Sequence, residues 1–136
     1  MKMTEKVEKL VSHRNWENIP ASRQILCVSG DGSPTRMSLA ALNQAFACVE
    51  AEASRSVNAV DAVIMSEVRL DDVWLWGIPV SNEKGGVRAT VFGAGVYAVE
   101  GCPDDKILVA SFEVGQKKTV VSSVTIVPAK EPGGVT

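Results

Sequence analysis

The sequence predicts an α+β fold that is mainly antiparallel β-structure in its C-terminal part. Two short links and a Gly-Gln pair separate four consecutive runs rich in Val, Ile, Thr and aromatic residues. The runs are Val87–Phe92, Val96–Glu100, Ile107–Val114 and Thr119–Val127. All three connections have hairpin lengths and are shorter than a parallel crossover, so we expect a four-stranded β-meander or a β-sandwich. An N-terminal helix, a small hairpin and one Ala-rich helix are expected ahead of it.

The bulk composition is that of an ordered globular protein. Of its 136 residues 46% are hydrophobic and 22% charged, which fits one domain or a small domain with an attached segment. The net charge of −2 supplies no basic surface, so no nucleic-acid partner is expected. No apolar run reaches the length of a membrane span, and residues 1–10 are too charged for a signal peptide. We therefore expect a protein made in the cytoplasm, with no membrane partner.

Three segments are expected along the chain. Residues 1–22 contain a short amphipathic helix, Met1–Ser12, and an extended connector, and we expect this segment to act as an anchor. Deletion of residues 1–18 is expected to leave the rest folded. Residues 23–56 contain the hairpin and the Ala-rich helix. Residues 57–136 form the β-rich domain, which ends in a tail, Ala129–Thr136, that we expect to be mobile.

The middle segment begins with strand and turn signals and continues as a helix. Gln24–Ser29 and Thr35–Met37 are predicted strands on either side of a turn that contains Gly30 and Pro34. Ser38 is the expected N-cap of a helix that runs to Ala53. This helix has few charges and a heptad-like apolar stripe. We expect the stripe to form an oligomer interface, the alternative being that it packs on the chain's own sheet. Its residues are Leu39, Leu42, Phe46 and Val49.

The stretch that follows is less regular. Val60–Leu70 fits either a strand or a helix, and the position of Glu67 in the helical stripe favours the strand. Asp71-Asp72 is then expected to form a turn, and Val73–Val80 an edge strand, because Pro79 cannot donate to a sheet ladder.

Candidate catalytic and cofactor motifs are weak throughout. Gly93–Ala98 matches the dinucleotide pattern G-x-G-x-x-[GA], but the residues after the glycines are stopped by Gly101 too soon for the helix that the motif requires. His13 is the single histidine, and no metal-ligand spacing surrounds it. The pairs Asp71-Asp72 and Asp104-Asp105 could offer oxygen ligands to calcium, but Asp is also a common turn former. We expect no enzyme, no cofactor and no metal.

Two groups of residues remain to be interpreted, the three cysteines and three of the aromatic residues. Cys27, Cys48 and Cys102 are an odd number without C-x-x-C spacing, which favours reduced thiols. Trp74 and Trp76 would share one face of a strand. Together with Tyr97 they could form a platform for a ligand, although burial is the commoner fate of such rings. The alternative function is therefore a cytoplasmic ligand- or carbohydrate-binding β-domain.

Residues 16–42 carry one resemblance. The runs Trp16–Ser22, Ile25–Gly32 and Thr35–Leu39 resemble the short N-terminal modules of tailed-bacteriophage fibre and capsid-appendage proteins. The resemblance implies a non-enzymatic virion structural protein, a capsid decoration or head-fibre component, made in the bacterial host and assembled as a homo-oligomer. Its partners would be further copies of itself and another virion protein such as a capsid protein. We expect attachment to the particle through Val7, Leu10, Trp16 and Ile19.

Overall fold

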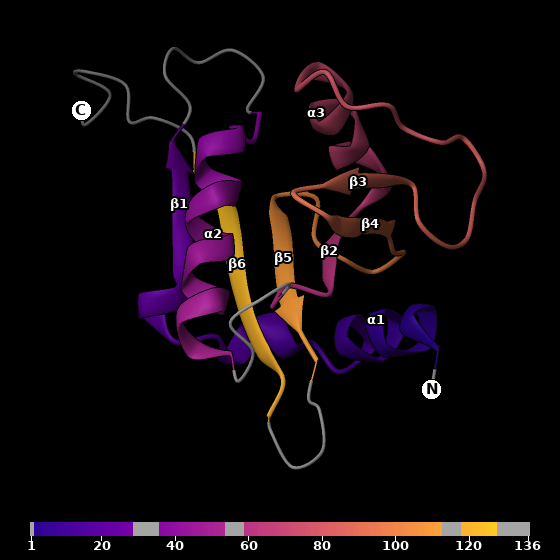
Figure 1. The fold of residues 1–136 in the computed structure, drawn as a ribbon. Coiled ribbons are helices and arrows are strands. Elements are labelled where there is room, and N and C mark those ends of the chain that lie inside the picture. Colours follow the sequence, from indigo (N-terminus) through magenta and orange to yellow (C-terminus); the bar gives the residue numbers. More distant parts are fainter. Residues whose placement is uncertain (1, 29–35, 54–58, 113–117, 128–136) are drawn as a thin grey trace, which may run out of the picture.

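The computed structural model describes residues 2–28, 36–53, 59–112 and 118–127 (Figure 1). Its helical segments are α1 (Met3–Ser12), η1 (Asn15–Asn18), η2 (Ala21–Arg23), α2 (Leu39–Glu52), η3 (Glu67–Arg69) and α3 (Leu70–Leu75). Its strands are β1 (Gln24–Val28), β2 (Ala62–Met65), β3 (Ala89–Val91), β4 (Ala94–Ala98), β5 (Lys106–Ser111) and β6 (Val120–Val127).

The strands form one six-stranded sheet in the order β1-β6-β5-β2-β4-β3. Three neighbouring pairs are antiparallel, β5 with β6, β2 with β5, and β3 with β4. The other two pairs, β1 with β6 and β2 with β4, are parallel. The expected α+β class with mainly antiparallel pairing is thus confirmed, as one mixed sheet rather than two stacked sheets.

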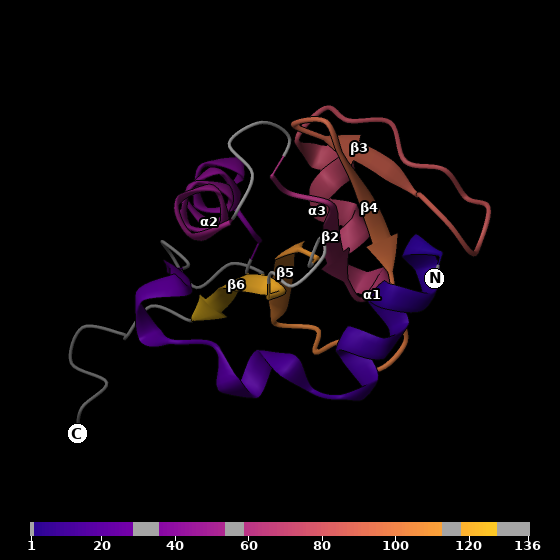
Figure 2. The ribbon, with the colours of Figure 1, turned by 60° about the horizontal axis from the view of Figure 1, so that its bottom comes forward.

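Helices cover both faces of this sheet, so its central strands are apolar on both sides (Figure 2). In β5, Ile107 and Val109 point toward the side of α2 and α3, while Leu108 and Ala110 point toward α1. All four side chains are fully buried. The alternation that predicts a strand therefore separates two cores here, because successive side chains leave a strand on opposite faces.

The expectation of an uninterrupted four-stranded meander is wrong between its second and third strands, β4 and β5. The β3–β4 and β5–β6 pairings form as expected, but β2 lies between β4 and β5, with Met65 opposite Ala98 on one side and Ile107 on the other. Crossing one intervening strand requires about 10 Å, which a link of a few residues spans easily at about 3.3–3.6 Å per residue. Link length alone therefore could not exclude the insertion. The turn expected at Gly115-Gln116 lies outside the described residues.

The region 60–80 is the second correction. The strand expected over Val60–Leu70 is limited to β2, and the strand expected over Val73–Val80 is wrong, because η3 and α3 occupy residues 67–75. Leu70 and Val73, three residues apart, are buried against the α2 side of the sheet. Asp71 and Asp72 lie in the first turn of α3, where negative charge favours a helix, instead of forming the expected turn.

The N-terminal half agrees with expectation except in its connections. α1 forms, and α2 begins after Ser38, whose hydroxyl accepts a hydrogen bond from the N–H of Ala41 at 3.1 Å. The connector is not extended but contains the two 3₁₀ segments η1 and η2. Of the expected hairpin, β1 forms and pairs in parallel with β6. Residues 29–35 lie outside the described part, and residues 36–37 are not in a strand.

Candidate functional site

A crevice opens where β2 and β4 end. These strands are parallel neighbours, so their carboxyl ends, Met65 and Ala98, meet at one edge of the sheet. The chain leaves β2 through η3 into α3, which packs on the α2 side, whereas the segment after β4 packs Val99 and Cys102 on the α1 side. Two neighbouring strands whose continuations leave toward opposite faces create the position at which ligands bind in open α/β sheets.

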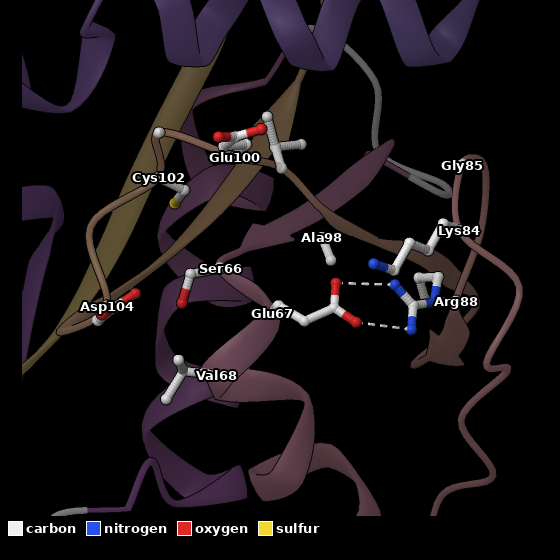
Figure 3. Close-up of a pocket in the computed structure, with 12 residues that line it drawn as sticks. Ser66, Glu67, Val68, Lys84, Gly85, Arg88, Ala98, Glu100, Cys102 and Asp104 are labelled. Atoms are coloured by element: carbon white, nitrogen blue, oxygen red, sulfur yellow. Dashed lines mark hydrogen bonds and ion pairs between the residues drawn. The ribbon is translucent and has the colours of Figure 1, made fainter.

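The crevice has a volume of about 450 Å³ and contains charged side chains from three segments of the chain (Figure 3). Ser66 and Glu67 line it directly after β2, and Glu100, Cys102 and Asp104 line it after β4. Lys84 and Arg88, from the segment before β3, complete the opposite wall. Residues 98–101 also line a second hollow, of about 670 Å³, that extends toward Trp16 beyond the end of α1.

The best-defined contact of the crevice is the ion pair between Arg88 and Glu67. The two terminal nitrogens of Arg88 donate to the two carboxylate oxygens of Glu67 at 3.0 and 2.9 Å. The Arg88 Nε donates to the carbonyl of Ser81 at 2.7 Å, and only 6% of the arginine is exposed. The Glu67 side chain is 59% exposed, and its hydrogen bonds with Arg88 lower its pKa. The guanidinium is thus held rigidly, by a partner that stands largely in solvent.

Ser66 and Cys102 form the buried part of the lining. Ser66 is only 7% exposed, and its hydroxyl has no hydrogen-bond partner among the described residues. Buried hydroxyls without a partner are uncommon, because desolvation without a compensating hydrogen bond is costly. Burial, together with the nearby charges of Asp104 and Asp105, raises the pKa of Cys102 to about 12. Its thiol therefore stays protonated at neutral pH and lacks the thiolate that nucleophilic catalysis needs.

The remaining charges of the crevice lie on opposite walls. Lys84 lies beside Arg88 on one wall, while Glu100 and Asp104 lie across from them (Figure 3). Within the described residues these three side chains form no ion pair. The described part of the chain also contains no group of three His, Cys, Asp or Glu placed to hold a metal ion. The crevice can therefore offer separate positive and negative groups to a ligand.

The expected oligomer interface lies within the chain's own core. Leu42, Phe46 and Val49 are buried, and Leu39 is half-buried, all against the sheet. The Phe46 ring also meets the ring of Phe92 edge-on, with 5.2 Å between their centroids. The alternative weighed for this stripe, packing on the chain's own sheet, describes the structure.

The residues expected to attach to a particle are also turned inward. Val7 and Leu10 of α1 are fully buried, together with Ile19, in the core on the α1 side of the sheet. Trp16 packs against the same core and is half-buried, with the Arg14 guanidinium over its ring. In the folded chain, the side chains of Val7, Leu10 and Ile19 are therefore not accessible to another protein.

The expected aromatic platform is not assembled. Trp74 lies on α3 and is 66% exposed, whereas Trp76 is half-buried and its ring N–H donates to the carbonyl of Met37 at 2.9 Å. Tyr97 is buried in the core on the other side of the sheet, and this burial raises its pKa. The expectation of a platform is wrong because Trp74 and Trp76 lie on and directly after a helix. Residues two apart share a face of a strand but not of a helix.

The glycine motif folds as the hairpin that was expected in preference to a dinucleotide site. Phe92 and Gly93 both have positive φ angles, 51° and 82°, and form the two-residue turn between β3 and β4. Ala94 and Gly95 already belong to β4. The three cysteines are free thiols, as expected, and among the described residues no helix is long and apolar enough to cross a membrane.

The residues of the crevice had no signal of their own in the sequence. In the sequence, Glu67 stands out only as a charge in an apolar stripe, and Arg88 lies 21 residues further along the chain. The pair Asp104-Asp105 indicates only a turn or a calcium ligand. A crevice assembled from three separated segments becomes visible only once the strand order is known.

Comparison with known proteins identifies no relative: no family model, curated protein or solved structure matches this chain.

Proposed function

We propose that this chain is a non-enzymatic binding protein that holds a small polar ligand in the crevice beyond β2 and β4. The observation that carries the proposal is the divergence of the chain from two adjacent parallel strand ends, which leaves a crevice of about 450 Å³ lined by charged groups. This proposal keeps the ligand-binding alternative of the sequence but moves its site to residues other than Trp74, Trp76 and Tyr97.

A nuclear magnetic resonance screen with small polar molecules tests this function. Ligands should shift the amide signals of Ser66, Glu67 and residues 99–101. The variant Ala98→Leu, which narrows the crevice, should weaken ligand binding at least tenfold. The matched control is Ala51→Leu, on the exposed side of α2. Ligands that shift only signals elsewhere, or that bind Ala98→Leu unchanged, would contradict the proposal.

A second candidate is the homo-oligomeric structural protein of a tailed-phage virion. Its support is the resemblance of residues 16–42 and one structural observation at the edge strand β1. β1 contains no charged residue, and its Leu26 is 62% exposed. Natural edge strands usually carry charges or proline that prevent pairing with another chain. Antiparallel pairing of two copies centred on Leu26 would bring this residue opposite its own copy and extend both sheets.

Analytical ultracentrifugation tests this second candidate. The wild type should sediment as a dimer or larger species, and Leu26→Lys should be a folded monomer. Leu75→Lys, at an exposed leucine of α3, is the control and should leave the assembly intact. A monomeric wild type at high concentration would exclude assembly through β1, and neighbouring genes for a capsid protein and a portal would support the virion role.

A further inference from the structure

We infer that the ligand of the crevice is a short peptide with free termini, with its carboxylate beside Lys84 and its ammonium group beside Glu100 and Asp104. This inference rests on the proposed function and adds the chemical class and the orientation of the ligand.

The first reason is the distribution of charge after the internal ion pair is counted. Glu67 and Arg88 neutralise each other through two hydrogen bonds. This leaves the cation of Lys84 on one wall and the anions of Glu100 and Asp104 on the other (Figure 3). A purely anionic ligand would face the carboxylates of Glu100 and Asp104, and a purely cationic one would face Lys84. Only a ligand with both charges, held apart, complements both walls.

The second reason is the buried Ser66 hydroxyl between these walls. It lines the crevice and has no hydrogen-bond partner among the described residues. A serine hydroxyl can donate one hydrogen bond and accept others, and it rotates freely to suit its partner. The amide groups of a peptide offer both donors and acceptors, so they can satisfy this hydroxyl once rotation of the serine side chain turns its oxygen, which is closed off from solvent in the unliganded chain, toward the crevice.

The third reason is size. In a free α-amino acid the two charged groups are attached to the same carbon, whereas Lys84 lies across the crevice from Glu100 and Asp104 (Figure 3). Each extended residue adds about 3.3–3.6 Å between the termini. Two or three residues therefore suit the separation better than one, and the adjoining hollow toward Trp16 leaves room for a side chain.

Titration of the full chain with four probes tests the inference: triglycine, its N-acetyl derivative, its C-terminal amide and free glycine. Amide shifts of Ser66, Glu67 and residues 99–101 report binding at the crevice. Triglycine should bind, and each of the other three should bind at least tenfold more weakly, because each lacks one charge or the separation between the charges. Equal binding of triglycine and either capped form would overturn the inference.

Variants then assign each charge to its wall. Lys84→Gln should remove the preference for triglycine over its amide, and the double variant Glu100→Gln, Asp104→Asn should remove the preference over the acetylated form. Asp105→Asn is the matched control, because Asp105 lies in the same turn but does not line the crevice. All these side chains are exposed, so the variants should fold, which circular dichroism verifies. Unchanged preferences in the folded variants would overturn the proposed orientation.

The outcomes also separate this inference from the proposed function. If none of the peptides binds but another polar molecule shifts the crevice signals, the ligand class is wrong and the binding function stands. If free glycine binds as well as triglycine, the site takes amino acids and the peptide class is wrong. If no molecule binds at the crevice, both the function and the ligand class fail.

Discussion

The Asp72 carboxylate accepts a hydrogen bond from the backbone N–H of Met37 at 3.0 Å, although 35 residues separate them in sequence. Both residues are buried. The carbonyl of Met37 is held as well, by the ring N–H of Trp76, and Arg69 donates to the same carboxylate at 3.0 Å. Asp72 of α3 and Trp76, directly after this helix, therefore hold both backbone groups of Met37, which leads into α2.

Replacing Asp72 with alanine should lower the free energy of unfolding by about 1–3 kcal/mol, because it leaves a buried N–H without an acceptor. Asp72→Asn should cost less, since its amide oxygen can still accept from Met37. Urea denaturation measures both. Asp71→Ala, at the exposed neighbouring position, should change stability by no more than about 0.5 kcal/mol. Equal stability of Asp72→Ala and Asp71→Ala would show that the hydrogen bond contributes nothing.

The Glu67–Arg88 pair predicts a dependence of stability on pH. The hydrogen bonds that Glu67 accepts from Arg88 hold the pKa of the Glu67 carboxyl below the ordinary value of 4.5. A carboxyl whose pKa is lowered on folding stabilises the folded state above its unfolded pKa, and this contribution is lost as the pH falls through the folded pKa. Glu67→Gln should thus be less stable than the wild type at pH 7, and the difference should shrink toward pH 3. Because the carboxylate is largely exposed, we expect a small effect.

Asp72 should titrate in the opposite direction. Burial is the largest influence on its carboxyl and raises the pKa above 3.8, against the hydrogen bond from Met37 and the charge of Arg69. The folded state then holds this proton more tightly than the unfolded state, so ionisation of Asp72 lowers stability as the pH rises from 3.8 through the raised pKa. Carboxyl ¹³C titrations should show Glu67 below and Asp72 above their ordinary values. The reverse order would contradict the contacts described.

The first helix should be required for stability. Val7, Leu10 and Val11 of α1 are buried in the core on its side of the sheet, so Leu10→Ala should cost about 2–5 kcal/mol in thermal or urea unfolding. Lys9→Ala, one residue away and exposed, is the control. Deletion of residues 1–18 should then destabilise the remainder, contrary to the expectation of a separable anchor. A deletion variant as stable as the full chain would restore that expectation.

Leu42→Glu should unfold the chain rather than only dissociate an oligomer. Leu42 belongs to α2 and is fully buried against the sheet, so an unpaired carboxylate there would have to be desolvated. Circular dichroism and light scattering, measured together, give the fold and the mass. Glu50, on the exposed side of the same helix, supplies the control Glu50→Gln. A folded Leu42→Glu monomer would instead support the interface first expected for this stripe.

Cys102 should react with iodoacetamide more slowly than Cys27 and Cys48. Its thiol is buried and its pKa is raised to about 12, whereas the other two cysteines are partly exposed. Since the thiolate is the reacting form, alkylation at pH 8 followed by mass spectrometry should label Cys102 last. Fast labelling of Cys102 in the folded protein would show that the crevice opens further than described.

Elements determined by local pattern were predictable from the sequence. The Ser38 cap and the spacing of Leu42 and Phe46 predict α2, and the alternation in residues 107–111 predicts β5. α3 was missed because its residues also fit a strand, and the contact of Asp72 with Met37 that favours the helix is a long-range one. The crevice depends in turn on β2 lying between β4 and β5. The position of β2 between β4 and β5 cannot be inferred from the lengths of the loops.

The parallel pairing of β1 with β6 limits how far the protein can fold while it is being synthesised. On the ribosome, β1 is synthesised among the first strands, and its neighbour β6 is the last. A nascent chain that has reached β5 already contains β1, β2 and the exposed Leu26, but β1 has no strand to pair with until residues 120–127 leave the exit tunnel. Such distant pairing slows folding and exposes unpaired strand edges to aggregation. Premature termination before β6 should therefore yield a product that depends on chaperones or is degraded.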